Sequence, residues 1–189
     1  TRFLYVSWLG DVYKRQGANP TDTEFFQKKH SFNNAKLTSF GMTKRTGRSA
    51  DNDPGLSALL NSNTPAVCIV GKSWDFHVDI ALGISNEENL ENIKETTKHF
   101  VKENKEFMFD AEHFFDGYKA NPNYALSCLK AAFDEGARWI VLCDTNGGTL
   151  PHEVTKIITE VSKTIPGKNL GIHAHLSLIH ISEPTRRRG

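Results

Sequence analysis

Residues 142–151 read Leu-Cys-Asp-Thr-Asn-Gly-Gly-Thr-Leu-Pro, and residues 171–175, about one βα unit later, read Gly-Ile-His-Ala-His. The first stretch is the end of an apolar strand that stops at a polar, glycine-rich turn. The second is strand-like and carries two histidines two positions apart, so that both side chains lie on one face. Parallel α/β proteins place their chemistry where strands end in polar loops. The two stretches therefore predict a parallel α/β fold with a site at its strand ends.

Further apolar segments extend this pattern along the chain. Five segments have strand character, and their starts are separated by roughly 30–40 residues, the length of one βα unit: residues 37–40, 66–70, 107–111, 139–143 and 170–173. Repeating βα units predict a parallel sheet with right-handed crossovers. Because a glycine-rich dinucleotide fingerprint is missing, a (β/α)₈ barrel is favoured over a doubly wound sheet. Residues 17–20, Gly-Ala-Asn-Pro, resemble the loop after an earlier strand, so we predict an incomplete TIM barrel, roughly strands 2 to 7.

Helix signals lie between these segments. Residues 21–24 and 85–88 read as capping boxes, and the Asn-Pro pair at residues 121–122 places an N-cap before a proline at the first helical position. Pro151 plays a similar part, and Gly136 is expected to end a helix over residues 125–135. Helices therefore alternate with the predicted strands.

The two ends of the chain look foreign to its middle. Residues 176–181, Leu-Ser-Leu-Ile-His-Ile, can be encoded by a DNA string whose reverse complement encodes residues 11–16, Asp-Val-Tyr-Lys-Arg-Gln. That string resembles a transposase adapter. We therefore interpret residues 1–16 and 176–189 as adapter-like, non-native flanks and residues 17–175 as a partial TIM-barrel catalytic domain. A natural basic tail at residues 186–188 is the alternative.

Charge and cysteine content narrow the function classes. The whole chain has 23 basic and 22 acidic residues, and without the flanks these become 17 and 20, a net charge of −3. This argues against nucleic acid or an anionic membrane as the main partner, and no apolar run approaches the ~20 residues of a membrane span. Cys68, Cys128 and Cys143 lack CxxC spacing, so we expect buried, apolar-like cysteines in a reducing, cytoplasmic setting.

The segment 107–117 carries a candidate catalytic group. Asp110 and Glu112 share one strand face with Met108, and apolar side chains share the other. The inward face at the carboxyl end of a barrel strand lines the active site, so Glu112 is a candidate general acid or base. A loop carboxylate that caps a nearby amide is an equally weighted alternative. His113 and the two phenylalanines after it are expected to pack.

His173 and His175 are candidate metal ligands. With Ile172 and Ala174 packed on the other face of the strand, the two imidazoles can converge on one ion. One buried structural histidine and one exposed histidine is the alternative. Two imidazoles do not complete a site, because at least one carboxylate and oxygens of substrate or water are also needed.

Other polar residues are expected to border the site. Thr145 is interpreted as facing the substrate and Asp144, on the opposite strand face, as structural. Lys72 and His77 follow the strand at 66–70 and are expected at the mouth of the site. Three basic residues of a loop could attract a phosphorylated cofactor such as coenzyme A, although a solvated basic loop is the alternative: Lys44, Arg45 and Arg48.

Six stretches together resemble one enzyme family. They are GANPTDTEFF (17–26), NAKLTSFGMTKR (34–45), GKSWDFHVDIAL (71–82), FDAEHFFDGYKANP (109–122), LCDTNGGTLPHEV (142–154) and GIHAH (171–175). The core resembles the catalytic barrel of the pyruvate-using citramalate synthases, within the isopropylmalate synthase and HMG-CoA lyase group of metal-dependent barrels. The resemblance covers residues 17–175, and GKSWDFHV and AEHFFDGYKANP are its more specific parts.

The resemblance implies a role for each candidate residue. His173 and His175 would bind a divalent metal (Mg or Mn, with Zn as an alternative), Glu112 would sit beside the reacting centre as an acid/base group, and Thr145 would hydrogen-bond the keto-acid carboxylate. The first-strand motif that supplies the family's catalytic Arg and metal-binding Asp is not found in this sequence, nor are its C-terminal dimer and regulatory regions. We therefore expect a homodimeric parent protein and an inactive 189-residue chain.

The implied reaction is a Claisen condensation of acetyl-CoA with pyruvate that gives (R)-citramalate, for isoleucine- and leucine-type branched-chain amino acid biosynthesis. Three alternatives stay open: a 2-isopropylmalate synthase or another enzyme of the group that uses a different keto acid, an HMG-CoA lyase-like enzyme, and a non-catalytic barrel fragment.

Overall fold

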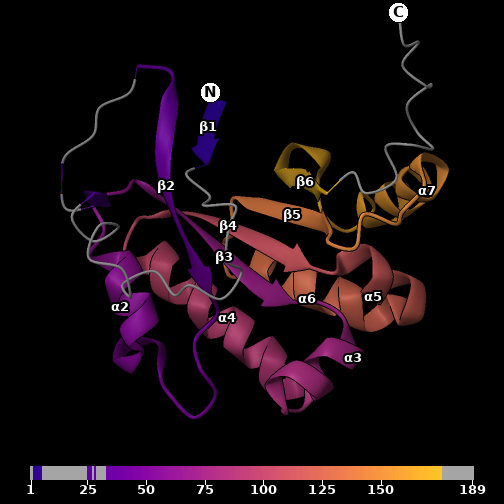
Figure 1. Ribbon diagram of the computed structural model, residues 1–189, viewed down its shortest axis with the longest axis horizontal. Coiled ribbons are helices and arrows are strands. Elements are labelled where there is room, and N and C mark those ends of the chain that lie inside the picture. Colours follow the sequence, from indigo (N-terminus) through magenta and orange to yellow (C-terminus); the bar gives the residue numbers. More distant parts are fainter. Residues whose placement is uncertain (1, 6–24, 27, 29–32, 176–189) are drawn as a thin grey trace, which may run out of the picture.

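A sheet of six parallel strands forms the centre of the molecule, in the order β1-β2-β3-β4-β5-β6. The computed structural model describes residues 2–5, 25–26, 28 and 33–175. The strands are β1 (Arg2–Tyr5), β2 (Ala35–Met42), β3 (Ala66–Lys72), β4 (Glu106–Glu112), β5 (Trp139–Asp144) and β6 (Leu170–Ala174). Neighbours in the sheet are also neighbours in sequence (Figure 1). β2 to β6 confirm the five predicted strands.

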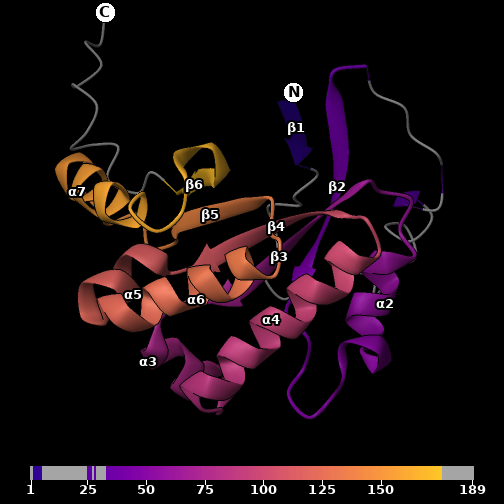
Figure 2. The same ribbon diagram turned by 180° about the vertical axis from the view of Figure 1, so that it is seen from behind.

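Helices follow the strands as the βα pattern predicts. They are η1 (Ala50–Asn52), α2 (Pro54–Leu60), α3 (Asp75–His77), η2 (Val78–Leu82), α4 (Asn86–Lys102), α5 (Phe114–Ala120), α6 (Pro122–Asp134), α7 (Pro151–Val161) and η3 (Gly167–Asn169). In both ribbon views α2, α4 and α6 lie on the same side of the sheet (Figures 1 and 2). A doubly wound sheet has helices on both faces and a reversal of strand order, so the described part is a segment of barrel-type α/β structure.

The sequence signals that begin and end the helices have the expected local geometry. The Ser85 side chain accepts a hydrogen bond from the Glu88 N–H at 3.1 Å and caps α4. Asn121 caps α6 through the Tyr124 N–H at 3.2 Å. Pro151 is the first residue of α7, and Gly136, with φ 98°, follows α6 in a left-handed conformation. The capping box predicted at residues 21–24 lies outside the described residues.

Alternation along β4 separates the helix side of the sheet from the opposite face. Phe107 and Phe109 are at most 1% exposed and join the core formed with the helices. Met108 packs with Ala66 and Cys68 in a second, smaller cluster. Because side chains alternate, Asp110 and Glu112 lie on the same face as Met108. The strand therefore places two carboxylates on the face that lines the inside of a barrel.

The two edge strands differ from expectation. β1 pairs parallel with β2 from Arg2↔Ala35 to Tyr5↔Thr38, although these residues were interpreted as part of a non-native flank. An unpaired sheet edge accepts extended segments through backbone hydrogen bonds, which gives a physical reason for the pairing. At the other edge Ile172 is 52% exposed and Ala174 is also exposed, so the prediction that they pack was wrong. The described helices pack mainly on β2 to β5.

Among the helices of the described ranges, none combines the length and the apolar character that a membrane crossing needs. The domain boundaries at residues 1–16, 17–175 and 176–189 stay predictions.

Candidate active site

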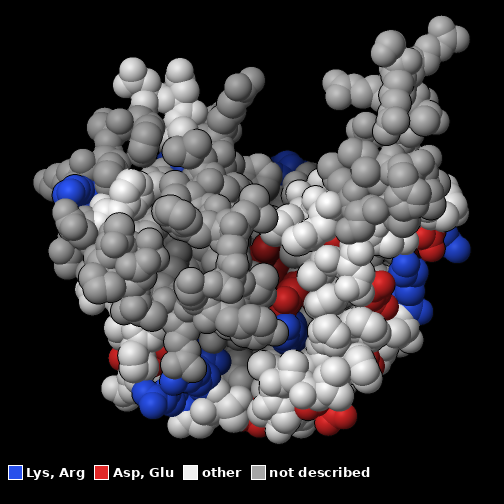
Figure 3. All heavy atoms as spheres, viewed as in Figure 1, with Lys and Arg blue, Asp and Glu red and all other residues white. Residues whose placement is uncertain are grey.

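The carboxyl ends of β3, β4, β5 and β6 place polar side chains close together. Parallel strands end at the same edge of a sheet, and the register pairs Lys72 of β3 with Glu112 of β4 and Cys143 of β5 with His173 of β6. On the face of the molecule that Figure 3 shows, acidic and basic side chains lie next to each other near the middle. The strand ends are therefore the natural place for a site in this fold.

Glu112 forms an ion pair and hydrogen bond with Lys72, which was predicted only to lie at the mouth of the site. Each side chain is 15% exposed. The backbone on both sides is fixed as well, because the Lys72 carbonyl accepts from the Asn89 side chain at 2.9 Å and the Glu112 carbonyl accepts from the Ser73 hydroxyl at 2.8 Å. Glu112 is thus the last residue of β4, with its carboxylate paired to Lys72.

Thr145 is fixed by the turn that follows β4. His113 has a left-handed backbone, with φ 57°, and its N–H donates to the Thr145 hydroxyl oxygen at 2.8 Å. Since that oxygen accepts from His113, the hydroxyl proton is available to donate elsewhere. Asp144 accepts from the Thr149 hydroxyl at 2.8 Å and from the Thr149 N–H at 3.3 Å. Its contacts are those of a residue that holds the glycine-rich turn.

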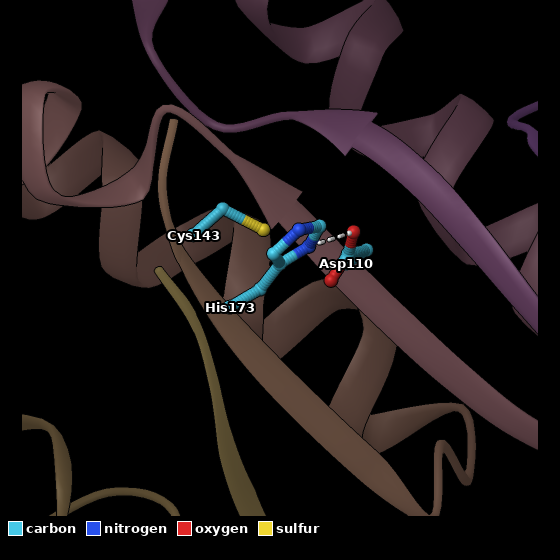
Figure 4. Close-up of side chains that lie close together, drawn as sticks. All are labelled: Asp110, Cys143 and His173. Carbon is cyan, nitrogen blue, oxygen red and sulfur yellow. Dashed lines mark hydrogen bonds and ion pairs between the residues drawn. The ribbon is translucent and has the colours of Figure 1, made fainter. Parts of the chain in front are cut away.

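His173 and His175 lie with their rings stacked, 5.1 Å apart between centroids. Both residues are exposed. Nδ1 of His173 is 3.1 Å from Oδ2 of Asp110, which is 3% exposed (Figure 4). The hydrogen bond to Asp110 raises the pKa of His173 above its usual value. Metal-binding histidines commonly give their second nitrogen to a carboxylate, so this pair fits a role in metal binding.

Cys143 lies beside Asp110 and His173, and one potential ligand atom from each residue falls within 4.8 Å of the others (Figure 4). Burial raises the pKa of the Cys143 thiol well above its usual value, and the neighbouring Asp110 carboxylate acts in the same direction. From the sequence we expected this cysteine to behave as an apolar side chain and predicted no role for Asp110. Cys143 lies two residues before Thr145, and Asp110 lies two residues before Glu112. Strand alternation therefore predicts that both face inward, and it could have identified them.

An aromatic group borders these strand ends. Trp74 stacks on His77 at 4.8 Å between centroids, and His77 meets His113 edge-on at 4.2 Å. Burial lowers the pKa of both histidines, and Lys72 adds to the effect on His77. Phe114 and Phe115 are fully buried, as expected. The two imidazoles and the indole form an aromatic wall next to the Lys72–Glu112 pair.

The basic loop after β2 is engaged within the protein. Nζ of Lys44 is 3.1 Å from Oε2 of Glu95 and donates to the Arg48 carbonyl at 2.9 Å. The Arg45 N–H donates to Asp53 at 2.8 Å. These contacts favour a structural role for Lys44; attraction of coenzyme A by this loop stays a prediction.

Comparison with known proteins gives two consistent results. A family model described as HMGL-like matches residues 40–178. Five (R)-citramalate synthases are 41–54% identical to the chain. The synthase of Aquifex aeolicus is 54% identical over 160 residues, which cover 84% of this chain and 30% of that protein. A 2-isopropylmalate synthase of Halothermothrix orenii is 25% identical over 134 residues, which cover 69% of this chain and 25% of that protein.

Solved structures support the fold. The HMG-CoA lyase of Brucella melitensis superposes with a TM-score of 0.67 at 14% identity, covering 82% of this chain and 53% of the lyase. At that identity the likeness concerns the fold alone, and it identifies the sheet as part of a TIM barrel. The chain spans about a third of the length of the curated synthases that it matches.

Proposed function

The chain belongs to the HMGL-like family, and we propose that the protein containing residues 17–175 condenses acetyl-CoA with pyruvate to give (R)-citramalate. In this reaction a base removes a proton from the methyl group of acetyl-CoA, and the enolate attacks the keto carbon of pyruvate. Hydrolysis of the thioester then releases coenzyme A and citramalate. We place the reaction at the carboxyl ends of β4, β5 and β6.

One observation carries the choice of substrate. The chain is 54% identical to a protein named (R)-citramalate synthase but 25% identical to one named 2-isopropylmalate synthase. Both names describe condensing enzymes of one group, so this difference favours pyruvate over a branched keto acid. 2-Isopropylmalate synthesis and HMG-CoA cleavage are the alternatives that the experiment must separate.

Glu112 is the proposed acid/base group. Its position at the end of β4 is set by Lys72, and its low exposure reduces competition from water for its proton. A carboxylate held in this way can transfer a proton at the reacting carbon or oxygen. The aromatic wall of Trp74, His77 and His113 next to it would exclude water from the acetyl group.

Thr145 is the proposed ligand for the pyruvate carboxylate. Its oxygen already accepts from the His113 N–H, so the hydroxyl is oriented to donate its proton. A hydrogen bond to a charged acceptor is worth about 1.5–3 kcal/mol. Asp144 keeps the following turn in place through Thr149, which fixes the end of β5.

His173 and His175 are the proposed metal ligands, and their residue types and contacts fit a divalent ion. His173 lies in β6 and His175 directly follows its end, and the two rings stack, with a carboxylate bonded to the first. When bound, a divalent metal would polarise the keto carbonyl and hold the carboxylate of the substrate. Asp110 holds the ring of His173 by its Nδ1, which leaves Nε2 available to the ion.

The setting follows from the same proposal. We place the parent protein in the cytoplasm, as a homodimer in branched-chain amino acid biosynthesis. Its partners would be pyruvate, acetyl-CoA and the metal, without nucleic acid or membrane.

A chimera tests the function. Residues 17–175 replace the matched segment of the Aquifex aeolicus (R)-citramalate synthase, and release of free coenzyme A is measured against pyruvate, 2-ketoisovalerate and 2-ketoglutarate. We expect pyruvate to be preferred. A folded chimera that prefers 2-ketoisovalerate would support a 2-isopropylmalate synthase instead, one that prefers 2-ketoglutarate would support another sister synthase, and cleavage of HMG-CoA would move the protein to the lyases.

A further inference from the structure

We propose that Asp110, Cys143 and His173 form a binding site for a thiophilic divalent cation, for which Zn²⁺ is the appropriate probe. We call this group the thiolate site. It differs from the proposed pair of His173 and His175, because it uses a sulfur ligand and a different second residue. It does not depend on the proposed enzymatic function.

The register of three adjacent strands brings these residues together. Cys143 and His173 are direct partners across β5 and β6, and Asp110 comes from β4 on the other side of β5. The potential ligand atoms lie within 4.8 Å of one another. The side chains point toward a common centre (Figure 4). Residues 110 and 173 are far apart in sequence, so only the sheet creates this group.

The distances are close to those around a bound ion. Zinc bonds of about 2.0–2.3 Å place neighbouring tetrahedral ligand atoms about 3.3–3.6 Å apart. Oδ2 of Asp110 and Nδ1 of His173 are 3.1 Å apart, in a hydrogen bond that an ion bound by both atoms would replace. No separation exceeds 4.8 Å, so each needs to close by at most about 1.5 Å. A rotation of the exposed His173 side chain can supply that movement.

An unsatisfied polar atom supports the presence of a ligand. Asp110 is 3% exposed, and its Oδ1 is buried without a hydrogen-bond partner in the described part of the structure. The Cys143 thiol interacts with the Asp110 carboxylate and makes a long contact with the Val141 carbonyl, 3.9 Å from Sγ. A buried carboxylate oxygen without a partner is costly. A cation between the three side chains would satisfy the Asp110 oxygen.

The ligand set selects the kind of ion. Thiolate and imidazole favour zinc, whereas magnesium prefers an octahedral shell of oxygen atoms. Three protein ligands leave a fourth tetrahedral position for water or a small anion. Binding would release the thiol proton to solvent. Because His173 is common to both sites, an ion at the thiolate site and an ion held by His173 with His175 would exclude each other.

The test is a titration of the 189-residue chain with Co²⁺, followed by competition with Zn²⁺ and with Mg²⁺. Co²⁺ bound to a thiolate gives a charge-transfer absorption in the near ultraviolet. We expect this band to form, to be removed by Zn²⁺ and to be unaffected by Mg²⁺. Cys143→Ser should abolish it, and Asp110→Asn should weaken Zn²⁺ binding by more than the roughly 10–100-fold that loss of an outer partner costs.

Two variants serve as matched controls. Cys128→Ser changes another buried cysteine, in α6, and should leave the band unchanged. His175→Ala should also leave it unchanged, because His175 is not part of the thiolate site. Near-ultraviolet circular dichroism checks that each variant is folded. Persistence of the band in folded Cys143→Ser, its loss in His175→Ala, or full Zn²⁺ affinity in folded Asp110→Asn would each overturn the proposal.

Discussion

The carboxyl ends of β4 and β6 carry proposed reactive groups of the same site, but the protein holds them in different ways. Glu112 is 15% exposed and paired with Lys72, and the backbone around the pair is tied by side chains of neighbouring elements. His173 is 48% exposed, and its ring is held by a single carboxylate contact. The carboxyl end of β4 is fixed by the packed centre of the sheet, whereas β6 is an edge strand.

The fold itself therefore positions one part of the site more firmly than the other. The Lys72–Glu112 pair and Thr145 are positioned by strand register and by the turn at His113, both of which belong to the folded core. The ring of His173 is positioned by Asp110, and the positions of both imidazoles also depend on the ion that they bind. Changes near β4 and β5 should therefore affect catalysis and stability strongly, whereas changes on β6 should act mainly through metal binding.

Removal of the acid/base group should reduce catalysis most strongly. In the chimera, Glu112→Gln keeps the shape of the side chain but cannot transfer a proton, so kcat should fall by about 10²–10⁴ with little change in the KM for pyruvate. The measurement is steady-state release of coenzyme A. Lys72→Met is the control, since it removes the partner but keeps the carboxylate, and its loss should be smaller. An equal or larger loss in Lys72→Met would transfer the main role to the lysine.

The second effect contrasts the stability of the two regions. Phe109 of β4 is fully buried, whereas Ile172 of β6 is 52% exposed. Phe109→Ala should lower the free energy of unfolding by about 3–5 kcal/mol, and Ile172→Ala by less than about 0.5 kcal/mol. Chemical denaturation of both variants measures the difference. A large loss in Ile172→Ala would mean that β6 is covered in solution and that the two regions are more alike than the structure indicates.

A smaller effect is expected at Thr145, where the structure adds a second role to the predicted one. Thr145→Val removes the acceptor of the His113 N–H, which would cost about 1–3 kcal/mol of unfolding free energy. It should also raise the KM for pyruvate in the chimera. Thr145→Ser keeps the hydroxyl and should retain most of both. If Thr145→Val changed stability but left the KM unaltered, the residue would be structural only.

The sequence alone could predict those features of the fold and the site that are determined within a single strand or a single βα unit. Alternation along a strand was sufficient to place Glu112 opposite the core phenylalanines, and His173 on one face with His175. The βα period was sufficient to predict parallel strands. Both are properties of a single segment.

The two ion pairs that the sequence did not predict, Lys72–Glu112 and Asp110–His173, are contacts between strands. Lys72 and Glu112 are 40 residues apart and Asp110 and His173 are 63 apart, and the register that joins them is set by how complete βα units pack. A slip of two residues would keep every alternation pattern and abolish each pair. The same limit applies to Ile172, whose exposure depends on which strand the neighbouring helix covers. The periodicity of the sequence does not predict which strand that helix covers.

The smallest expected effect concerns the two ends of the chain and the edge strand β1. We predict that deleting residues 1–16 and residues 176–189, separately and together, leaves the melting temperature unchanged or raises it. The reason is the reverse-complement relation between residues 11–16 and 176–181, which indicates that neither segment was selected to pack against this core.

Deletion of residues 1–16 is the stricter test of this prediction, because β1 pairs with β2 and the deletion removes a strand from the sheet. Backbone pairing at an edge does not require a matching sequence, so solvent should replace it at little cost. In a domain of this size 1 kcal/mol moves the melting temperature by about 2–4 °C. A fall beyond that range on deleting residues 1–16 alone, with no change on deleting 176–189, would show that β1 stabilises its edge as the central strands stabilise theirs.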